Sequence, residues 1–321
     1  MIMLIKSAVA ACLATTALAE TQLGFCYGSQ NEDWSCRGYE DFKRYFENAK
    51  TLASAEGKQF TSARLYTSIQ CGTTNDPISA YKAAIDTDTK ILVGRWASAC
   101  DESYSHELES LLSASFQYGK AFTDLVVGIS VGSEDLYRKT SAGNEQGATA
   151  GDIVKYIGEL RYVIHNEINA LENIPVGHVD TYTAWIRPEN ALVVDAVDWL
   201  GHKSFPYWES NESNAIENAP NLFWSALEKT RSSARGKDVW VTETGWPHAG
   251  PLSGAAVASV ENAHLYWSNV GCALFEQEVN VWWYILVDSN ANQREVEFGL
   301  TKTGDVSKPV FDLKCNETRR V

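Results

Sequence analysis

Short apolar runs, rich in β-branched and aromatic residues, alternate along the chain with longer stretches whose apolar residues recur at helical spacing. Strands that are apolar throughout and separated by helices are typical of a parallel sheet covered on both faces. The runs predict eight strands, at Leu23–Tyr27, Ser62–Thr67, Lys90–Trp96, Leu125–Val131, Val176–Tyr182, Trp199–Phe205, Asp238–Thr242 and Val281–Val287. The segments between them predict helices, among them Asp41–Gly57, Ser105–Gly119, Gly151–Leu171 and Ala256–Glu276.

Eight strand–helix units in one α/β chain favour a single closed (β/α)8 TIM barrel, whose catalytic face lies at the C-terminal strand ends. An open, doubly wound sheet is the alternative. Such a sheet normally has a Gly-rich phosphate turn after its first strand, and the segment Gly24–Gly28 does not fit one. No linker, charge block or low-complexity tract divides the chain, so we expect one domain over residues 20–321.

The first 19 residues are expected to be a cleaved secretory signal peptide. Met1–Ala19 carries one charged side chain, Lys6, then an apolar run, and it ends in the small-x-small pattern Ala17-Leu18-Ala19. A transmembrane anchor is the alternative, but the run is too short for one. The polar end of the chain, residues 314–321, is not typical of a lipid anchor. We therefore expect a secreted, extracellular protein without a membrane anchor.

Six cysteines remain once Cys12 is removed with the signal peptide. An even number in an oxidising compartment indicates disulfides rather than metal ligands. From their closeness in the expected barrel we predict the pairs Cys26–Cys36, Cys71–Cys100 and Cys272–Cys315. The sequons at Asn211 and Asn316 fit a secreted glycoprotein. The histidines show no metal spacing, so no metal or other cofactor is expected.

Composition narrows the choice of partner. The chain has 321 residues, of which 45% are hydrophobic, and this is enough to exclude a disordered protein. Its formal net charge of -14 argues against binding nucleic acid or anionic membranes through charge. A neutral polysaccharide is fully compatible with it. The 11 tryptophans and 14 tyrosines suit stacking on sugars, although packing in the core is their commoner role.

Two glutamates stand where an apolar strand stops: Glu134 after the fourth predicted strand and Glu243 after the seventh. In a barrel both strand ends face one cavity. Cleavage of a glycosidic bond needs one carboxylic acid to protonate the leaving oxygen and a second carboxylate to attack or stabilise the sugar carbon. The alternative makes them salt-bridge partners for Arg64 or Arg138.

Several motifs resemble glycoside hydrolase family 17. They are Gly28 after Cys26-Tyr27, Val131-Gly132-Ser133-Glu134, Val241-Thr242-Glu243-Thr244-Gly245-Trp246-Pro247, Phe205-Pro206-Tyr207-Trp208 and Phe298-Gly299-Leu300. The chain looks closest to the secreted fungal branch, which cuts or transfers β-1,3-glucan at the cell wall. The resemblance implies a (β/α)8 barrel and a retaining mechanism, with Glu134 as acid/base and Glu243 as nucleophile. The acid must then be protonated and the nucleophile ionised.

The chain departs from the family pattern at two positions. The residue before the acid/base is usually Asn, which can bond the sugar 2-hydroxyl, and here it is Ser133. Many relatives also carry Asn three residues before the strand-six proline, where this chain has Lys203. Neither change removes a carboxylate, but either could alter affinity for the sugar or the product balance.

Further side chains are expected around the pair. Arg64 could hold Glu243 ionised or form a structural ion pair, and Tyr27 ends strand one on the same face. The remaining candidates are residues that could stack on sugars or bond hydroxyls, with core packing or a solvated loop as the alternative: Tyr182, Tyr207, Trp246, Asp288 and Asn290.

The expected function is a retaining, β-1,3-glucan-active glycosidase that acts as a monomer on the polysaccharide. Whether water or another glucan end accepts the sugar stays open, so hydrolysis and transglycosylation are both compatible with the sequence. A wall protein that binds glucan without turning it over is the alternative from another class. A further alternative is a glycosidase that cleaves β-1,4 or β-1,6 linkages, since only the family resemblance indicates the β-1,3 linkage.

Overall fold

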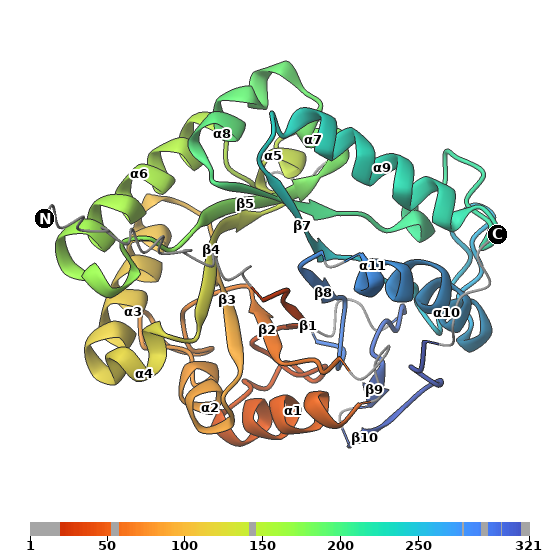
Figure 1. Cartoon of the computed structure of the whole chain (residues 1–321), viewed down its shortest axis with the longest axis horizontal. Helices are drawn as coiled ribbons and strands as arrows, with labels where there is room; N and C mark the ends of the chain where they lie inside the picture. Colours follow the sequence, from red (N-terminus) through yellow and green to blue (C-terminus); the bar gives the residue numbers. More distant parts are fainter. Residues whose placement is uncertain are drawn as a thin grey trace, which may run out of the picture.

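Eight parallel strands close into a barrel in the order of the sequence, from β1 to β8 (Figure 1). The computed structural model describes residues 20–52, 58–140, 146–277, 279–289, 295–302 and 304–315. The expected signal peptide, Asn290 and Asn316 lie outside these residues. The strands are β1 (Leu23–Tyr27), β2 (Ser62–Leu65), β3 (Lys90–Arg95), β4 (Val126–Ser133), β5 (Val176–Thr181), β6 (Trp199–Lys203), β7 (Asp238–Glu243) and β8 (Val281–Trp283). The predicted (β/α)8 barrel is confirmed.

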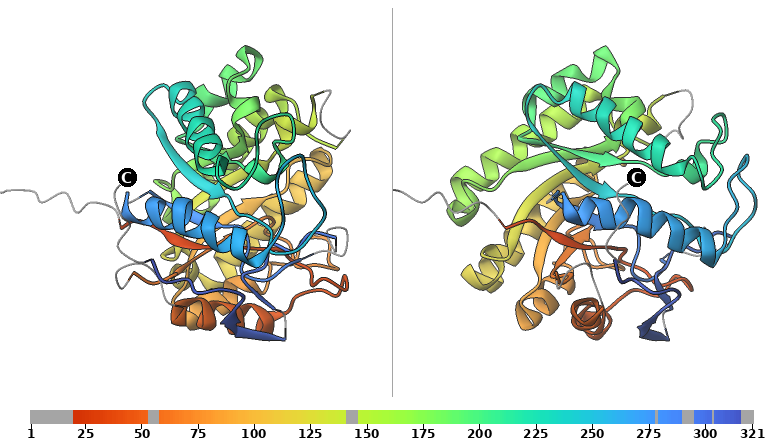
Figure 2. Two further views of the ribbon diagram at one scale, coloured as in Figure 1. Left: turned by 90° about the vertical axis from the view of Figure 1, so that its right-hand side faces the viewer. Right: turned by 45° about the vertical axis from the view of Figure 1, so that its right-hand side comes forward.

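The helices surround the strands on the outside, as the two further views in Figure 2 also show. The longer helices bury an apolar face; α1, for example, buries Phe42, Tyr45 and Phe46, and α6 buries Ile153, Ile157 and Leu160. The helices are α1 (Tyr39–Thr51), α2 (Ala80–Thr87), α3 (Asp101–Tyr118), α4 (Lys120–Thr123), α5 (Asp135–Arg138), α6 (Ala150–Glu167), α7 (Tyr182–Trp185), α8 (Ala191–Ala196), α9 (Ala219–Ser233), α10 (Val260–Tyr266) and α11 (Cys272–Glu276). Shorter 3-10 turns are η2 (Asn169–Leu171), η3 (Pro188–Asn190) and η4 (Pro206–Trp208), and η5 (Trp267–Gly271) is a π-helical turn.

A small antiparallel pair, β9 (Thr301–Lys302) and β10 (Asp305–Pro309), lies outside the barrel, with β10 beside α1 (Figure 1). The predicted helix over residues 256–276 begins later, at Val260, and contains the π-helical turn η5. Within the described residues, no helix has the length and apolar character needed to cross a membrane.

The N-terminal half of the barrel interior is filled by aromatic side chains. Trp199 of β6 stacks on Trp240 of β7, with ring centroids 4.0 Å apart, and Trp240 contacts Trp282 of β8. The indole of Trp282 donates to Ser62 Oγ at 3.0 Å, which satisfies its buried N–H. Because this end is packed, an extended ligand has room only at the opposite end, where the strands finish.

Two disulfides join the described cysteines: Cys36–Cys71 and Cys272–Cys315. The prediction of Cys272–Cys315 is confirmed, and the predictions of Cys26–Cys36 and Cys71–Cys100 are wrong. Cys26 is free because its side chain points into the barrel, where Sγ lies 3.3 Å from the carbonyl of Thr242. Cys36 therefore pairs with Cys71, which joins the loop after β1 to the loop after β2. Cys100, just before α3, is free and exposed.

Candidate active site

Glu134 stands in a tight turn between β4 and α5. Its backbone is left-handed, with φ 61°, and its N–H donates to Val179 O at 2.9 Å on the neighbouring strand. The carboxylate of Asp180 accepts the N–H of Leu136 at 2.9 Å, which holds the first turn of α5 in place. The side chain of Glu134 reaches the barrel mouth, where it is 19% exposed, and its Oε2 accepts from Arg138 Nη2 at 3.4 Å.

Glu243 is the last residue of β7, and its side chain is 1% exposed. The guanidinium of Arg64, equally buried on β2, contacts Glu243 Oε1 through Nη1. Arg64 also lies over the ring of Tyr66, 4.6 Å from its centroid. A carboxylate this deeply buried needs charged partners to stay ionised, and Arg64 is the first of these.

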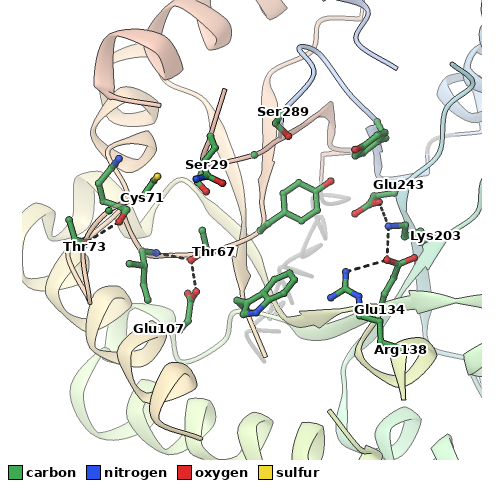
Figure 3. Close-up of a pocket in the computed structure, with 18 residues that line it drawn as sticks. Ser29, Thr67, Cys71, Thr73, Glu107, Glu134, Arg138, Lys203, Glu243 and Ser289 are labelled. Atoms are coloured by element: carbon green, nitrogen blue, oxygen red, sulfur yellow. Dashed lines mark hydrogen bonds and ion pairs between the residues drawn. The ribbon is translucent and has the colours of Figure 1, made fainter. Parts of the chain in front are cut away.

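The second partner is Lys203, which bridges the two glutamates. Lys203 is the register partner of Glu243 on the adjacent strand β6. Its Nζ lies 2.8 Å from Glu243 Oε2 and 3.1 Å from Glu134 Oε2. Dashed lines mark both contacts in Figure 3. Because both oxygens contact one nitrogen, they are at most about 6 Å apart. This upper limit lies below the ≈ 6.5–9.5 Å of inverting glycosidases and is compatible with the ≈ 5–5.5 Å of retaining ones.

The charges around Glu243 decide its ionisation. Burial by itself would raise the pKa of this carboxyl, but the adjacent Lys203 and Arg64 outweigh burial and lower the pKa to about 2. Burial would likewise lower the pKa of Lys203, yet the charges of Glu134 and Glu243 raise it overall. Glu243 is therefore an anion and Lys203 a cation over the whole pH range in which the protein is expected to work.

Three adjoining cavities meet at Glu134 and Lys203, with volumes of about 550, 530 and 370 Å3. The largest of the three also contains Glu243 and extends over the loops after β1, β2 and β3, where Ser29, Thr67 and Cys71 line it (Figure 3). Tyr66 and Trp96 line the same cavity. The other two extend toward the loops after β5 and β6 and after β8, and Phe205 and Trp208 line both. The carboxylate pair thus lies within a groove that continues on both sides.

Arg64 and Ser133 join the site as supports beneath the carboxylates. Arg64 Nη2 donates to Ser133 Oγ at 3.1 Å, and both side chains are buried. Tyr182 lies at the rim, where it lines the second cavity and Lys229 packs over its ring. The structure therefore brings these three predicted residues together with Glu134 and Glu243.

Four other predicted residues lie in packing contacts and are absent from the cavity linings described above. Tyr27 packs edge-on against Phe46 of α1, with ring centroids 5.0 Å apart. Tyr207 is fully buried and donates to Pro251 O, and Trp246 packs on it and donates to Val257 O at 3.0 Å. Asp288 accepts the backbone N–H groups of Phe298 and Gly299, so it fixes the segment after β8.

The structure adds aromatic residues that are not among the predicted site residues, although Phe205 and Trp208 belong to a motif of the family resemblance: Tyr66, Trp96, Phe205, Trp208 and Tyr284. A positional signal was present, because Tyr66 and Trp96 follow β2 and β3 directly and thus fall on the catalytic face. Lys203 was noted as a departure from the family pattern, but its contact with both glutamates was not foreseen. Among the described residues, no cluster of three or more His, Cys, Asp or Glu side chains could hold a metal ion.

Comparisons with known proteins agree with a glycosidase site. Residues 24–300 match the model of the BtgE/BtgC glycoside hydrolase domain. A probable glucan endo-1,3-beta-glucosidase of Aspergillus oryzae is 48% identical over 98% of this chain and 66% of its own length. A glucan 1,3-beta-glucosidase of Schizosaccharomyces pombe is 27% identical over 98% of this chain and 93% of its own length. The chain thus spans about two thirds of the Aspergillus relative and nearly all of the yeast one.

A solved structure has the same barrel. The glycoside hydrolase family 17 beta-1,3-glucanosyltransferase of Rhizomucor miehei superposes with a TM-score of 0.73 at 25% identity, over 92% of this chain and 98% of the other. The family model covers most of the sequence, and the carboxylate pair described above falls within it. The chain therefore belongs to the BtgE/BtgC family of glycoside hydrolases.

Proposed function

We propose that the protein cleaves β-1,3-glucan with retention of configuration, through a covalent glycosyl-enzyme intermediate. The observation that carries this proposal is the pair Glu134 and Glu243, whose Oε2 atoms both contact Lys203 Nζ and so face each other across a gap of sugar size. The names of the Aspergillus and Rhizomucor relatives support the β-1,3 linkage. A non-catalytic binding role would give no reason for two opposed carboxylates at the centre of the groove.

The two glutamates take different roles because their surroundings differ. Glu243 is buried between Arg64 and Lys203 and stays ionised, as a nucleophile requires. Glu134 is partly exposed at the mouth, where it can give a proton to the leaving oxygen and later take one from the incoming hydroxyl. One carboxylate thus attacks the anomeric carbon while the other moves protons.

The molecule that attacks the glycosyl-enzyme intermediate decides between hydrolysis and transfer. Water gives hydrolysis, and a second glucan chain gives transfer. The groove continues past the pair on both sides, and Phe205 and Trp208 offer apolar surface on which a second glucan chain could stack. We infer that a sugar acceptor can compete with water at the intermediate. The activity of the Rhizomucor relative, a glucanosyltransferase by name, supports this reading.

The products from a defined linear β-1,3-glucose hexamer test the proposal. Retention predicts that the newly formed reducing end first appears as the β-anomer in proton NMR spectra recorded within minutes. Transfer predicts products longer than the hexamer, whereas hydrolysis alone gives only shorter ones. Initial formation of the α-anomer would contradict the retaining mechanism. Binding of the hexamer without any shorter or longer product between pH 4 and 7 would favour the non-catalytic role.

We also propose that the protein is secreted to the cell wall as a monomer, after removal of residues 1–19. The two disulfides support an oxidising compartment. Mass spectrometry of the protein from culture medium should give a mature chain that begins near Glu20. Size-exclusion chromatography with light scattering should give the mass of one chain, with any N-glycan at Asn211 or Asn316 added.

A further inference from the structure

Lys203 contacts both carboxylates of the site. Its Nζ contacts Glu134 at 3.1 Å and Glu243 at 2.8 Å, and both Lys203 and Glu134 line all three cavities. A sugar chain that lies along the groove must place its reacting bond between the two carboxylates. The anomeric carbon must therefore come next to this ammonium. To make room for the sugar, the ammonium has to move and to break its contact with either Glu134 or Glu243.

The contact with Glu134 is the one that can be given up. Glu243 is buried and nearer to the ammonium, whereas Glu134 is 19% exposed and keeps Arg138 as a second cationic neighbour. Glu134 must also be protonated to act as an acid, and a protonated carboxyl attracts an ammonium less than an ionised one does. The side chain of Lys203 has four rotatable bonds, so its Nζ can shift without movement of β6.

Ser133 is poorly placed to hold the sugar next to the nucleophile. Its Oγ accepts from Arg64 Nη2 at 3.1 Å, and its side chain is buried. Lys203, in contrast, lines the groove and carries three N–H donors, and its described contacts are ion pairs with the two carboxylates. An ammonium that stays bound to Glu243 would lie beside the carbon that Glu243 attacks, and the 2-hydroxyl is on the adjacent carbon.

We propose that Lys203 contacts the substrate, exchanging Glu134 for the 2-hydroxyl of the sugar that Glu243 attacks while its bond to Glu243 persists. The inference rests on the proposed function and deepens it. The 2-hydroxyl accepts from the ammonium, and its own proton is then free to point at the carboxylate. Hydrogen bonds at this hydroxyl strengthen as the oxocarbenium-like transition state forms, so Lys203 contributes to catalysis as well as to binding.

A pair of substrates tests this contact directly. One is 2,4-dinitrophenyl β-laminaribioside, whose leaving group needs no proton, and the other lacks the 2-hydroxyl on the reacting sugar. Lys203→Met keeps the length of the side chain and removes its charge. It should lower kcat/KM on the parent substrate about 30-fold more than on the 2-deoxy substrate, the worth of one charged hydrogen bond. A loss of nucleophilicity at Glu243 that does not involve the 2-hydroxyl affects both substrates equally and cancels in this ratio.

The matched control is Lys120→Met, which removes an exposed lysine that pairs with Asp124 outside the groove. It should leave both rates unchanged. An equal loss on both substrates in Lys203→Met would overturn the proposal, because Lys203 would then act only through the carboxylates.

Binding separates this inference from the proposed function. In the Glu134→Gln background, adding Lys203→Met should weaken calorimetric binding of a β-1,3-glucose tetramer about tenfold, through loss of a charged hydrogen bond. Unchanged affinity would also overturn the inference. A protein that shows this loss of affinity, but whose unsubstituted form never turns over either substrate, would keep the Lys203 contact and refute the proposed catalysis.

Discussion

Arg64 Nη2 donates to Ser133 Oγ at 3.1 Å, while Nη1 of the same guanidinium contacts the carboxylate of Glu243. Ser133, which precedes Glu134 at the end of β4, thus binds Arg64, which in turn contacts Glu243 at the end of β7. Because one rigid, planar group makes both contacts, the positions of the two glutamates are coupled through the barrel interior.

Ser133→Ala removes this connection without removing a charge. We expect kcat/KM on a β-1,3-oligosaccharide to fall about tenfold, since a hydrogen bond from a charged group is worth roughly 1.5–3 kcal/mol. Ser130→Ala is the control, because Ser130 lies on the same strand and donates only to Gly132 O among its described contacts. Steady-state kinetics of both variants would check this, and equal effects would argue against the coupling.

The roles of the two glutamates can be separated with azide. We expect kcat to fall at least about a thousandfold in Glu134→Ala and in Glu243→Ala. The fall should appear both with the dinitrophenyl substrate and with glucan. Azide should restore Glu134→Ala by attacking the intermediate and give a β-glycosyl azide. It should restore Glu243→Ala by replacing the nucleophile and give an α-glycosyl azide.

Product configuration from carbon NMR distinguishes these two cases, and the reverse pattern would exchange the assigned roles. Glu228→Ala, at an exposed position on α9, is the matched control and should retain the full rate. Near-normal rates in both site variants would refute the assignment altogether.

The low pKa of Glu243 predicts a specific loss of stability in acid. Its folded value of about 2 lies below the ordinary 4.5, so the ionised carboxylate favours the folded state. That contribution is fully present above about pH 4.5 and is lost as the pH falls toward 2, by about 3 kcal/mol in total. Urea unfolding at several pH values should therefore show a steeper decline for the unsubstituted protein than for Glu243→Gln. Parallel curves would contradict the low pKa.

The Cys36–Cys71 disulfide is expected to shape the groove, because Cys71 lines the largest cavity. Replacing both cysteines by Ser should cost about 2–4 kcal/mol of stability and also raise KM for long oligosaccharides, with little change in kcat. The matching change at Cys272 and Cys315 should destabilise similarly but leave KM unchanged, since neither lines the cavities described above. Equal KM values for the two double variants would contradict this role.

Trp208 is expected to provide a stacking surface. Its side chain is 51% exposed and lines two of the cavities beside Glu134. Trp208→Ala should weaken binding of a β-1,3-glucose hexamer about tenfold, from lost aromatic contact of roughly 1–1.5 kcal/mol. Phe116→Ala removes an exposed aromatic side chain of α3 outside these cavities and should change nothing. Calorimetric titration gives both values.

Much of the barrel could be predicted from the sequence because buried parallel strands are continuously apolar and their beginnings are sharp. The predicted strand ends are less accurate: the sixth predicted strand reaches Phe205, but β6 ends at Lys203. The aromatic residue Phe205 suits a strand locally, yet the following Pro206 begins the 3-10 turn η4 instead. Local preference therefore cannot distinguish the last strand residues from an apolar loop.

The strand-end glutamates were predictable from topology alone, whereas the direction of neighbouring side chains was not. Cys26 and Arg64 are register partners that both point into the barrel, so the next residue, Tyr27, points outward to α1. This alternation could have excluded Tyr27 from the groove. The bridge formed by Lys203 depends on the register between β6 and β7 and on the length of the turn at Glu134, and neither has a signature in the sequence.

The continuation of the groove beyond both carboxylates has a consequence for how a polymer would be attacked. A glucan strand that lay along these cavities would not have to terminate at the barrel mouth, so its interior linkages would be as accessible as its ends. Random internal scission reduces the viscosity of a glucan solution long before much free glucose accumulates. In a wall, the same geometry would let the protein act within a crosslinked mesh in which few strands offer a loose end.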